Sequence, residues 1–91
     1  MAIGNLGVGN AKNITADTLI KTGQGTLLGV LVNAASSTPT LTVYDGTDTN
    51  GTKLVNALPL TAGQYVPIPA AVGTGIYVDV GGTVDLTIFW L

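Results

Sequence analysis

The segment GIYVDVGGTVDLTIFWL, residues 75–91, alternates apolar and polar residues on both sides of a Gly-Gly pair. Alternation of this kind predicts two β-strands, and the glycines between them favour a hairpin turn. A two-residue loop would set Val78 opposite Asp85 and mix apolar with charged residues on one face. A three-residue loop over residues 81–83 makes one face wholly apolar. It pairs Val80 with Val84, Val78 with Leu86, and Ile76 with Ile88. The sequence therefore predicts a hairpin with the longer loop.

The other face of this hairpin carries a pair of aspartates. The same register sets Asp79 opposite Asp85 and Tyr77 opposite Thr87, with Phe89 beyond them. Like charges directly across a sheet are destabilising. Either a cation or a donor from a partner bridges the two carboxylates, or both are solvated at a splayed hairpin tip. A pair at the tip of a small hairpin has no evident cleft for the acid–base hydrolysis of sugars.

Short β-rich runs recur along the rest of the chain between Gly, Pro, Asn, Asp and Ser. They are Ala16–Lys21, Thr26–Val32, Thr40–Tyr44, Lys53–Leu58, Gln64–Ile68, Gly75–Val80 and Val84–Trp90. Even spacing predicts an all-β fold, a compact antiparallel β-sandwich or jelly-roll-like barrel of about seven to eight short strands.

The strand Thr26–Val32 is apolar on both alternating faces. Leu28, Val30 and Val32 share one face, and Leu27 and Leu31 share the other. A strand with two apolar faces is expected to be buried on both sides. We expect it to lie centrally, or to face the core on one side and a neighbouring subunit on the other.

The chain is short, and its N-terminal segment shows no periodic pattern of apolar residues. Residues 1–13, MAIGNLGVGNAKN, are rich in Gly and Asn and are expected to form a flexible arm before a single domain over residues 14–91. A chain of 91 residues builds only a marginal core, which disulfides, metals or oligomerisation usually support. With no Cys, His or Glu in the sequence, oligomerisation is the favoured route.

The composition argues against several classes of function. Only 9% of residues are charged, the net charge is −2, and the three lysines form no basic patch, so nucleic-acid binding is not expected. A nucleophilic Ser or Thr would lack a histidine base, so we expect no enzyme. Residues 1–12 lack the pattern of a signal peptide, and no apolar run is long enough for a membrane span. We therefore expect synthesis in the cytoplasm and no membrane partner.

Two further features are candidate sites. The loop DGTDTNGTK, residues 45–53, echoes part of a calcium loop, but Gly46 and Ala57 stand where ligands are needed. Asx-type turns account for it, so no metal and no cofactor are predicted. Tyr44, Tyr77 and Phe89 are expected to face away from the core and to mark a subunit interface. Leu27, Leu31, Asp79 and Asp85 complete the candidate interface.

Three segments carry a resemblance to a known family. They are TLIKTGQGTLLGVLVNAASSTPTLTVYDGT, GTKLVNALPLTAGQYVPIP and GIYVDVGGTVDLTIFW, which together cover most of residues 16–91. In their order they resemble small virion-associated proteins of tailed bacteriophages, in particular head decoration, or cement, proteins.

The resemblance implies a compact β-sandwich or jelly-roll-like module that binds the major capsid protein and clamps capsid subunits after expansion, often as trimers. It places the protein on the capsid surface of a virion made in a bacterial cytoplasm. The same folds carry many functions, so two alternatives stay open. One is a receptor- or glycan-binding module of a head or tail fibre, and the other is a minor tail or neck component.

Overall fold

The computed structural model of the protein describes residues 9–91, which form six antiparallel β-strands in one open sheet that is not closed into a barrel. No helix occurs within these residues. The strands are β1 (Asn10–Ile14), β2 (Thr18–Thr22), β3 (Gly25–Asp45), β4 (Thr52–Pro59), β5 (Tyr65–Val72) and β6 (Gly75–Trp90). The all-β, antiparallel class expected from the alternating runs is confirmed.

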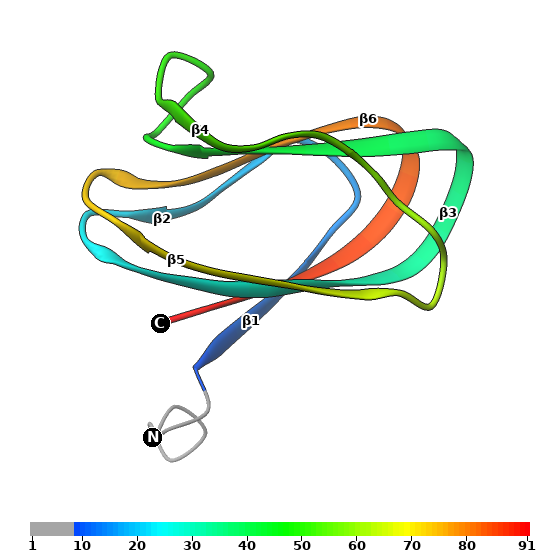
Figure 1. The fold of residues 1–91 in the computed structure, drawn as a ribbon, viewed down its shortest axis with the longest axis horizontal. Coiled ribbons are helices and arrows are strands. Elements are labelled where there is room, and N and C mark those ends of the chain that lie inside the picture. The colour runs from blue at the N-terminus through cyan, green and yellow to red at the C-terminus, as the bar shows by residue number, and fades with distance from the viewer. Residues whose placement is uncertain (1–8) are drawn as a thin grey trace.

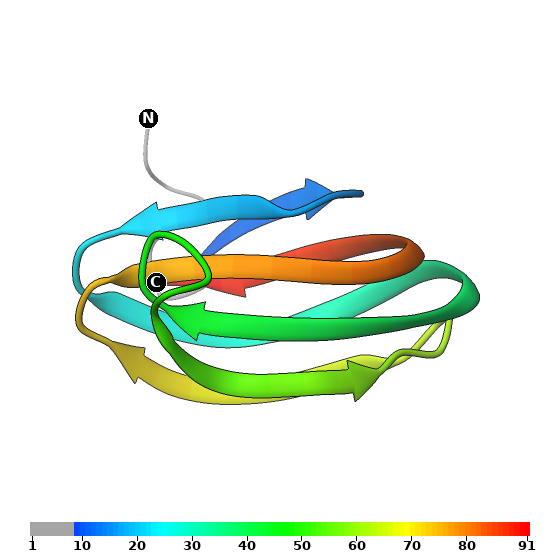
Figure 2. The same ribbon diagram turned by 90° about the horizontal axis from the view of Figure 1, so that it is seen from above.

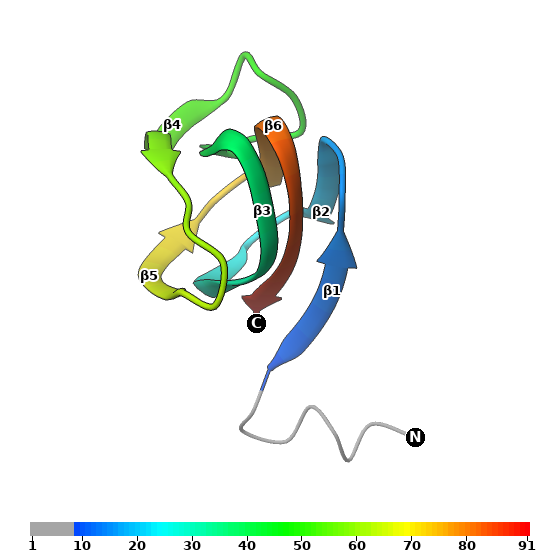
Figure 3. The same cartoon turned by 90° about the vertical axis from the view of Figure 1, so that its right-hand side faces the viewer.

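Two long strands, β3 and β6, organise the whole sheet. They pair antiparallel from Leu27↔Trp90 to Asp45↔Ile76 and bend over together, so that the sheet faces itself in two layers (Figures 1 and 3). The first layer runs β2, β6, β3, β4, as seen side by side in Figure 2, and uses the early part of β6 and the late part of β3. The second layer runs β1, β6, β3, β5 and uses the other parts of the two long strands.

The bend is built from local backbone features of both long strands. The β3–β6 register shifts between Ser36 and Thr40, and within this interval Ser37 and Thr38 have positive φ of 60° and 48°. Opposite them Gly82 has a φ of 78°, and a Cβ at this glycine would lie 2.9 Å from the Pro39 Cα. Left-handed backbone on one strand and a glycine on the other therefore turn the sheet over.

The core lies between the two layers. The largest fully buried side chains of the described residues all come from β3 and β6. They are Leu27, Val30, Val32, Leu41, Val43, Ile76, Val78, Leu86 and Ile88. Each long strand thus supplies apolar residues to both walls of the core, because alternate side chains point to the same face before and after the bend.

A bulge in β3 changes which of its leucines are buried. Leu28 has no partner in the register between Leu27↔Trp90 and Gly29↔Phe89, so the alternation slips by one residue there. Leu27 and Val30 are both fully buried, whereas Leu28 and Leu31 are half-buried. The prediction that Leu27 lies at an interface is therefore wrong, because the bulge turns it into the core.

The predicted hairpin at residues 75–91 is also wrong. Residues 75–90 form one continuous strand that bends over and pairs with β3 on both sides of the bend. Val78 lies opposite Val43 and Leu86 opposite Val32, instead of Val78 opposite Leu86. The predicted apolar side of residues 75–90 is confirmed as the inward side of β6. The two parts of β6 face each other across the core from opposite layers.

Three other expectations need correction. Thr26–Val32 and Thr40–Tyr44 belong to one strand, β3, so the sheet has six strands where seven to eight short ones were expected. The predicted barrel does not close. Residues 10–13 of the predicted arm belong to β1, which pairs with β6, and residues 1–8 of that arm lie outside the described residues.

Candidate interaction surfaces

Apart from Leu27, which lies in the core, the predicted interface residues lie on two different outer surfaces, one on each layer. We call the outward side of the first layer the acidic face and that of the second layer the apolar face. The acidic face carries Asp17, Leu19, Thr42, Tyr44, Lys53, Tyr77 and Asp79. The apolar face carries Leu28, Leu31, Tyr65, Phe89 and Leu91, with Asp85 at one end.

A row of four residues crosses the acidic face. Leu19 lies opposite Tyr77, Tyr77 opposite Tyr44, and Tyr44 opposite Lys53. The rings of the two tyrosines are 6.3 Å apart and tilted by 50°. Tyr44 is only 7% exposed although it points away from the core, and the β3–β4 loop rises from this side of the molecule (Figure 1). Tyr44 therefore offers little surface to a partner.

Asp17 and Asp79 form a carboxyl pair beside this row. Asp17 Oδ1 accepts the backbone N–H of Val80 at 2.9 Å, which brings its side chain next to Asp79. Burial, then the charge of Asp17 and a hydrogen bond with it, raise the pKa of Asp79. Burial and the charges of Asp17 and Asp79 also raise the pKa of the Tyr77 phenol. This face is thus an acidic surface on which the pKa of one carboxyl group is raised.

The apolar face gathers large side chains from β3, β5 and β6. Leu31 lies opposite Tyr65, and the Tyr65 and Phe89 rings are 6.1 Å apart in an edge-to-face arrangement. A Cβ at Gly29 would meet the Tyr65 phenol group, so the tyrosine ring lies over the bare backbone between Phe89 and β5. Leu31 and Phe89, both named as candidate interface residues, lie on this face, whereas Tyr65 was not singled out from the sequence.

Two leucines extend this surface toward the end of β6. A Cβ at Gly9 would lie 3.0 Å from Leu28 Cδ1 and 3.3 Å from Leu91 Cδ2, so both side chains lie beside the start of β1. Leu91 continues the β6 pairing, because its N–H donates to Thr26 O at 2.8 Å. Tyr65 is 51% exposed and Leu91 50% exposed. Large apolar surface therefore remains open to solvent here.

Asp85 is held by amide groups at the edge of the apolar face. Asn13 Nδ2 and Asn33 Nδ2 both donate to Asp85 Oδ1, the second at 3.1 Å. The same amides also donate to Leu86 O at 2.9 Å and to Thr87 Oγ1 at 3.0 Å. The network joins β1, β6 and β3, and it gives one of the two carboxylate oxygens two hydrogen bonds within the protein itself.

The predicted pairing of Asp79 with Asp85 is wrong. Asp79 lies opposite Thr42 in the first layer, and Asp85 lies opposite Ala34 in the second. The two carboxylates are on opposite outer surfaces because β6 folds over between them. Within residues 9–91 no three Asp, Glu, His or Cys side chains are grouped so that they could hold a metal ion.

The loop over residues 45–53 contains a turn and an anchor. Asp48 Oδ1 accepts the Asn50 N–H at 2.8 Å, which confirms the predicted Asx-type turn, and β3 and β4 pair on either side of the loop. The Asp45 carboxylate accepts the backbone N–H groups of Gly73, Thr74 and Gly75 at 2.9–3.3 Å. These bonds lower the pKa of Asp45 and fix the β5–β6 turn.

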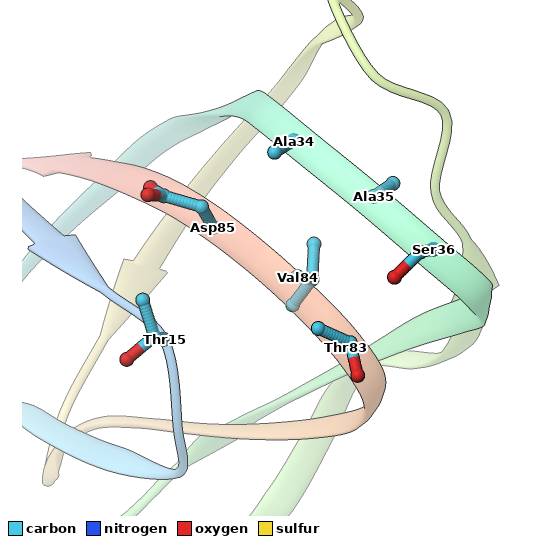
Figure 4. Close-up of a pocket in the computed structure, with 7 residues that line it drawn as sticks. All are labelled: Thr15, Ala34, Ala35, Ser36, Thr83, Val84 and Asp85. Atoms are coloured by element: carbon cyan, nitrogen blue, oxygen red, sulfur yellow. The ribbon is translucent and has the colours of Figure 1, made fainter.

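A hollow of about 340 Å³ lies beside the bend, between β3, β6 and Thr15 (Figure 4). Ala34, Ala35 and Val84 give it an apolar lining, and the hydroxyls of Ser36 and Thr83 lie at its side. No aromatic or basic side chain is among the described residues that line it. Its one carboxylate, Asp85, accepts hydrogen bonds from Asn13 and Asn33.

None of the described residues forms a helix that is long and apolar enough to cross a membrane.

Tyr65, the exposed aromatic missed from the sequence, alternates in phase with Pro67 and Pro69 of β5. That phase was the available signal that it faces outward. Comparison of the chain with protein-family models, with curated proteins and with solved structures found no match.

Proposed function

We propose that the protein is a structural virion protein that binds the major capsid protein on the outside of an expanded phage head and stabilises the head. In this proposal it has no enzymatic activity, is made in the host cytoplasm and acts as a homo-oligomer, with a trimer as the expected form. The folded-over sheet then serves as a compact module of the sandwich or jelly-roll type.

The observation that carries the proposal is the apolar face. An exposed surface of large side chains with a single carboxylate at one end is suited to stable protein contacts that salt hardly weakens. The order of the three segments that resemble phage decoration proteins supports the virion as the place of those contacts. A protein that binds only the expanded lattice stabilises it by mass action, and many copies add avidity.

The test uses heads that lack the protein. Expanded and unexpanded heads are each mixed with the purified protein, sedimented, and heated while release of DNA is followed. We expect saturable binding of many copies to expanded heads only, and rupture at a higher temperature by several degrees. The matched control is the same preparation without the protein.

One outcome would favour the open alternatives. If the protein leaves head binding and rupture temperature unchanged but attaches to cells or to glycans, it is a fibre module. If it is found only at the neck or tail of the particle, it is a minor tail or neck component.

A further inference from the structure

One asparagine differs from the others in its place in the fold. Asn50 is exposed and lies in the loop between β3 and β4, and Gly51 follows it. The remaining asparagines within residues 9–91 belong to β1, β3 and β4 and precede alanine or isoleucine. They are Asn10, Asn13, Asn33 and Asn56. In this part of the chain, Asn-Gly in an exposed loop therefore occurs at a single place.

Asn-Gly is a sequence with a reactivity of its own. The backbone nitrogen of the residue after an asparagine can attack the side-chain amide carbon, because the product is an unstrained five-membered ring. The attack needs a backbone that can rotate toward the side chain and a backbone N–H that can lose its proton. Glycine favours the rotation, since it has no Cβ to crowd the approach and visits a wide range of conformations.

The Gly51 N–H is held weakly in the folded protein. It donates to Asp48 O at 3.3 Å, which is longer than the usual length of about 2.9–3.0 Å for such a bond. The Asn50 N–H donates to Asp48 Oδ1 at 2.8 Å, so the Asx-type turn engages the nitrogen of Asn50 and not the nitrogen that reacts. Water has access to Asn50 at this exposed position.

The asparagines in strands lack these conditions. The backbone N–H that follows Asn56 donates to Thr42 Oγ1 at 3.0 Å. The side-chain amides of Asn13 and Asn33 donate to the Asp85 carboxylate. β1 pairs regularly with β6, and a backbone that is paired in a sheet resists rotation. Asn50 is therefore the described asparagine that is best placed to react.

We propose that Asn50 is a site of spontaneous deamidation, with water as the second reactant. Hydroxide takes the proton of the Gly51 nitrogen, and this nitrogen attacks Asn50 Cγ. As the new N–Cγ bond forms, the Cγ–Nδ2 bond breaks, and Nδ2 takes a proton from water and leaves as ammonia. The cyclic product is a succinimide, and no atom is oxidised or reduced.

Water then opens the ring in one of two ways. Cleavage of the new N–Cγ bond leaves an aspartate, whereas cleavage of the bond between the Gly51 nitrogen and the Asn50 carbonyl carbon leaves an isoaspartate. Either product adds a negative charge to a chain of net charge −2. The reaction requires neither a partner nor a phage head, so it goes beyond the proposed function.

The neck of the loop makes the isoaspartyl product the more damaging one. A Cβ at Gly46 would lie 2.8 Å from Gly51 Cα, and a Cβ at Gly51 would lie 2.6 Å from Asp45 O. The Gly46 N–H also donates to Gly75 O at 3.1 Å, which joins the neck to the β5–β6 turn. Isoaspartate inserts a methylene group into the main chain directly before Gly51, where this close contact leaves no room for it.

The test follows the reaction in the folded protein. Wild type, Asn50→Ser and the control Asn56→Ser, which removes another exposed asparagine, are incubated at neutral and at alkaline pH. Circular dichroism checks that each is folded, ion exchange measures the more acidic form, and released ammonia is assayed. Cleavage after lysine yields the peptide of residues 22–53, in which fragment masses distinguish Asn50 from Asn33.

We expect wild type and Asn56→Ser to form the acidic species at the same rate, faster at alkaline pH, with the added mass at Asn50. Asn50→Ser should form it at least about tenfold more slowly, which is ~1.4 kcal/mol in the barrier. Equal rates in wild type and Asn50→Ser, an added mass at Asn33 or Asn56, or no release of ammonia at alkaline pH would overturn the assignment.

Asn50→Asp separates the effect of the charge from that of the main chain. This variant carries the added carboxylate without the added methylene group. We expect its Tm to match that of wild type and the Tm of the isolated isoaspartyl form to be lower. Equal Tm values for the isoaspartyl form and Asn50→Asp would refute the strain at Gly51.

Discussion

Asp17 Oδ1 accepts the N–H of Val80 at 2.9 Å, which ties the start of β2 to β6 just before the bend. The bond places a second carboxyl group beside Asp79 on the acidic face. A single hydrogen bond between a side chain and the backbone thus holds an edge strand in place. The same bond creates repulsion between the carboxylates of Asp17 and Asp79. The cost of that repulsion depends on pH.

Asp79→Asn is expected to raise stability at neutral pH. Burial and Asp17 raise the pKa of Asp79, so the contribution of Asp79 to stability is complete below its unfolded pKa of about 3.9 and is lost as pH rises through its folded pKa. Removing the ionisable group removes that loss. Thermal melts should show a higher Tm than wild type at pH 7 and convergence of the two at acid pH.

The control for this variant is Asp48→Asn, which changes the net charge equally without touching the carboxyl pair. If Asp48→Asn raises the Tm as much as Asp79→Asn, general charge reduction explains the effect and the pair does not.

Asp45→Asn is expected to act with the opposite sign. Hydrogen bonds from Thr74, then Gly73 and Gly75, lower the pKa of Asp45, so its stabilisation is present above the unfolded pKa of about 3.9 and is lost as pH falls through the folded pKa. The variant should have a lower Tm than wild type at pH 7, with a difference that shrinks in acid. A difference independent of pH would show that the charge of Asp45 is unimportant.

Gly82→Ala is expected to destabilise the bend by at least about 1–2 kcal/mol, the cost of a side chain in the left-handed region. A Cβ at Gly82 would in addition lie 2.9 Å from the Pro39 Cα, which cannot move freely because Pro39 is buried. Chemical denaturation of Gly82→Ala and of Gly73→Ala gives the comparison. Gly73 has open space around its Cβ position, so its substitution should cost clearly less.

The double substitution of Ser37→Asn with Thr38→Gly is expected to stabilise the protein by roughly 1 kcal/mol. Both residues have positive φ, which a β-branched threonine rarely adopts, whereas Asn-Gly suits two consecutive left-handed positions. Denaturation midpoints should rise at an unchanged slope. A fall would mean that contacts of the Ser37 and Thr38 side chains outweigh the backbone strain.

The alternation in residues 75–91 identified the buried side of β6 correctly but not its partner. Ile76, Val78, Leu86 and Ile88 are all fully buried, as the pattern predicted. A hairpin and a folded-over strand place the same residues inward. Alternation predicts which side of the sheet a side chain faces, but it does not predict which strand pairs with its own. Only the length of pairing with β3 distinguishes the two, and β3 is distant in sequence.

The composition of the interaction surfaces was less accessible to prediction. Leu27 and Leu31 are four residues apart and should share a face in a regular strand, but the bulge at Leu28 separates them. A bulge depends on how two strands match over their whole lengths, which no local pattern states. The sequence around Asp17 does not predict that its carboxylate lies next to that of Asp79. The two are brought together only by the pairing of β2 with β6.

The central position of β6 has a consequence for synthesis of the chain. Of the six described strands β6 is synthesised last, and β1, β2 and β3 all pair with it. Until its 16 residues are available, β1 and β2 have no neighbour in the sheet, and β3 can reach only β4 and β5. Folding therefore awaits the most distant pairings, which is slow and leaves apolar strands open to aggregation. We expect nascent chains that stop before Gly75 to expose these apolar strands, which makes them substrates for chaperones and proteases.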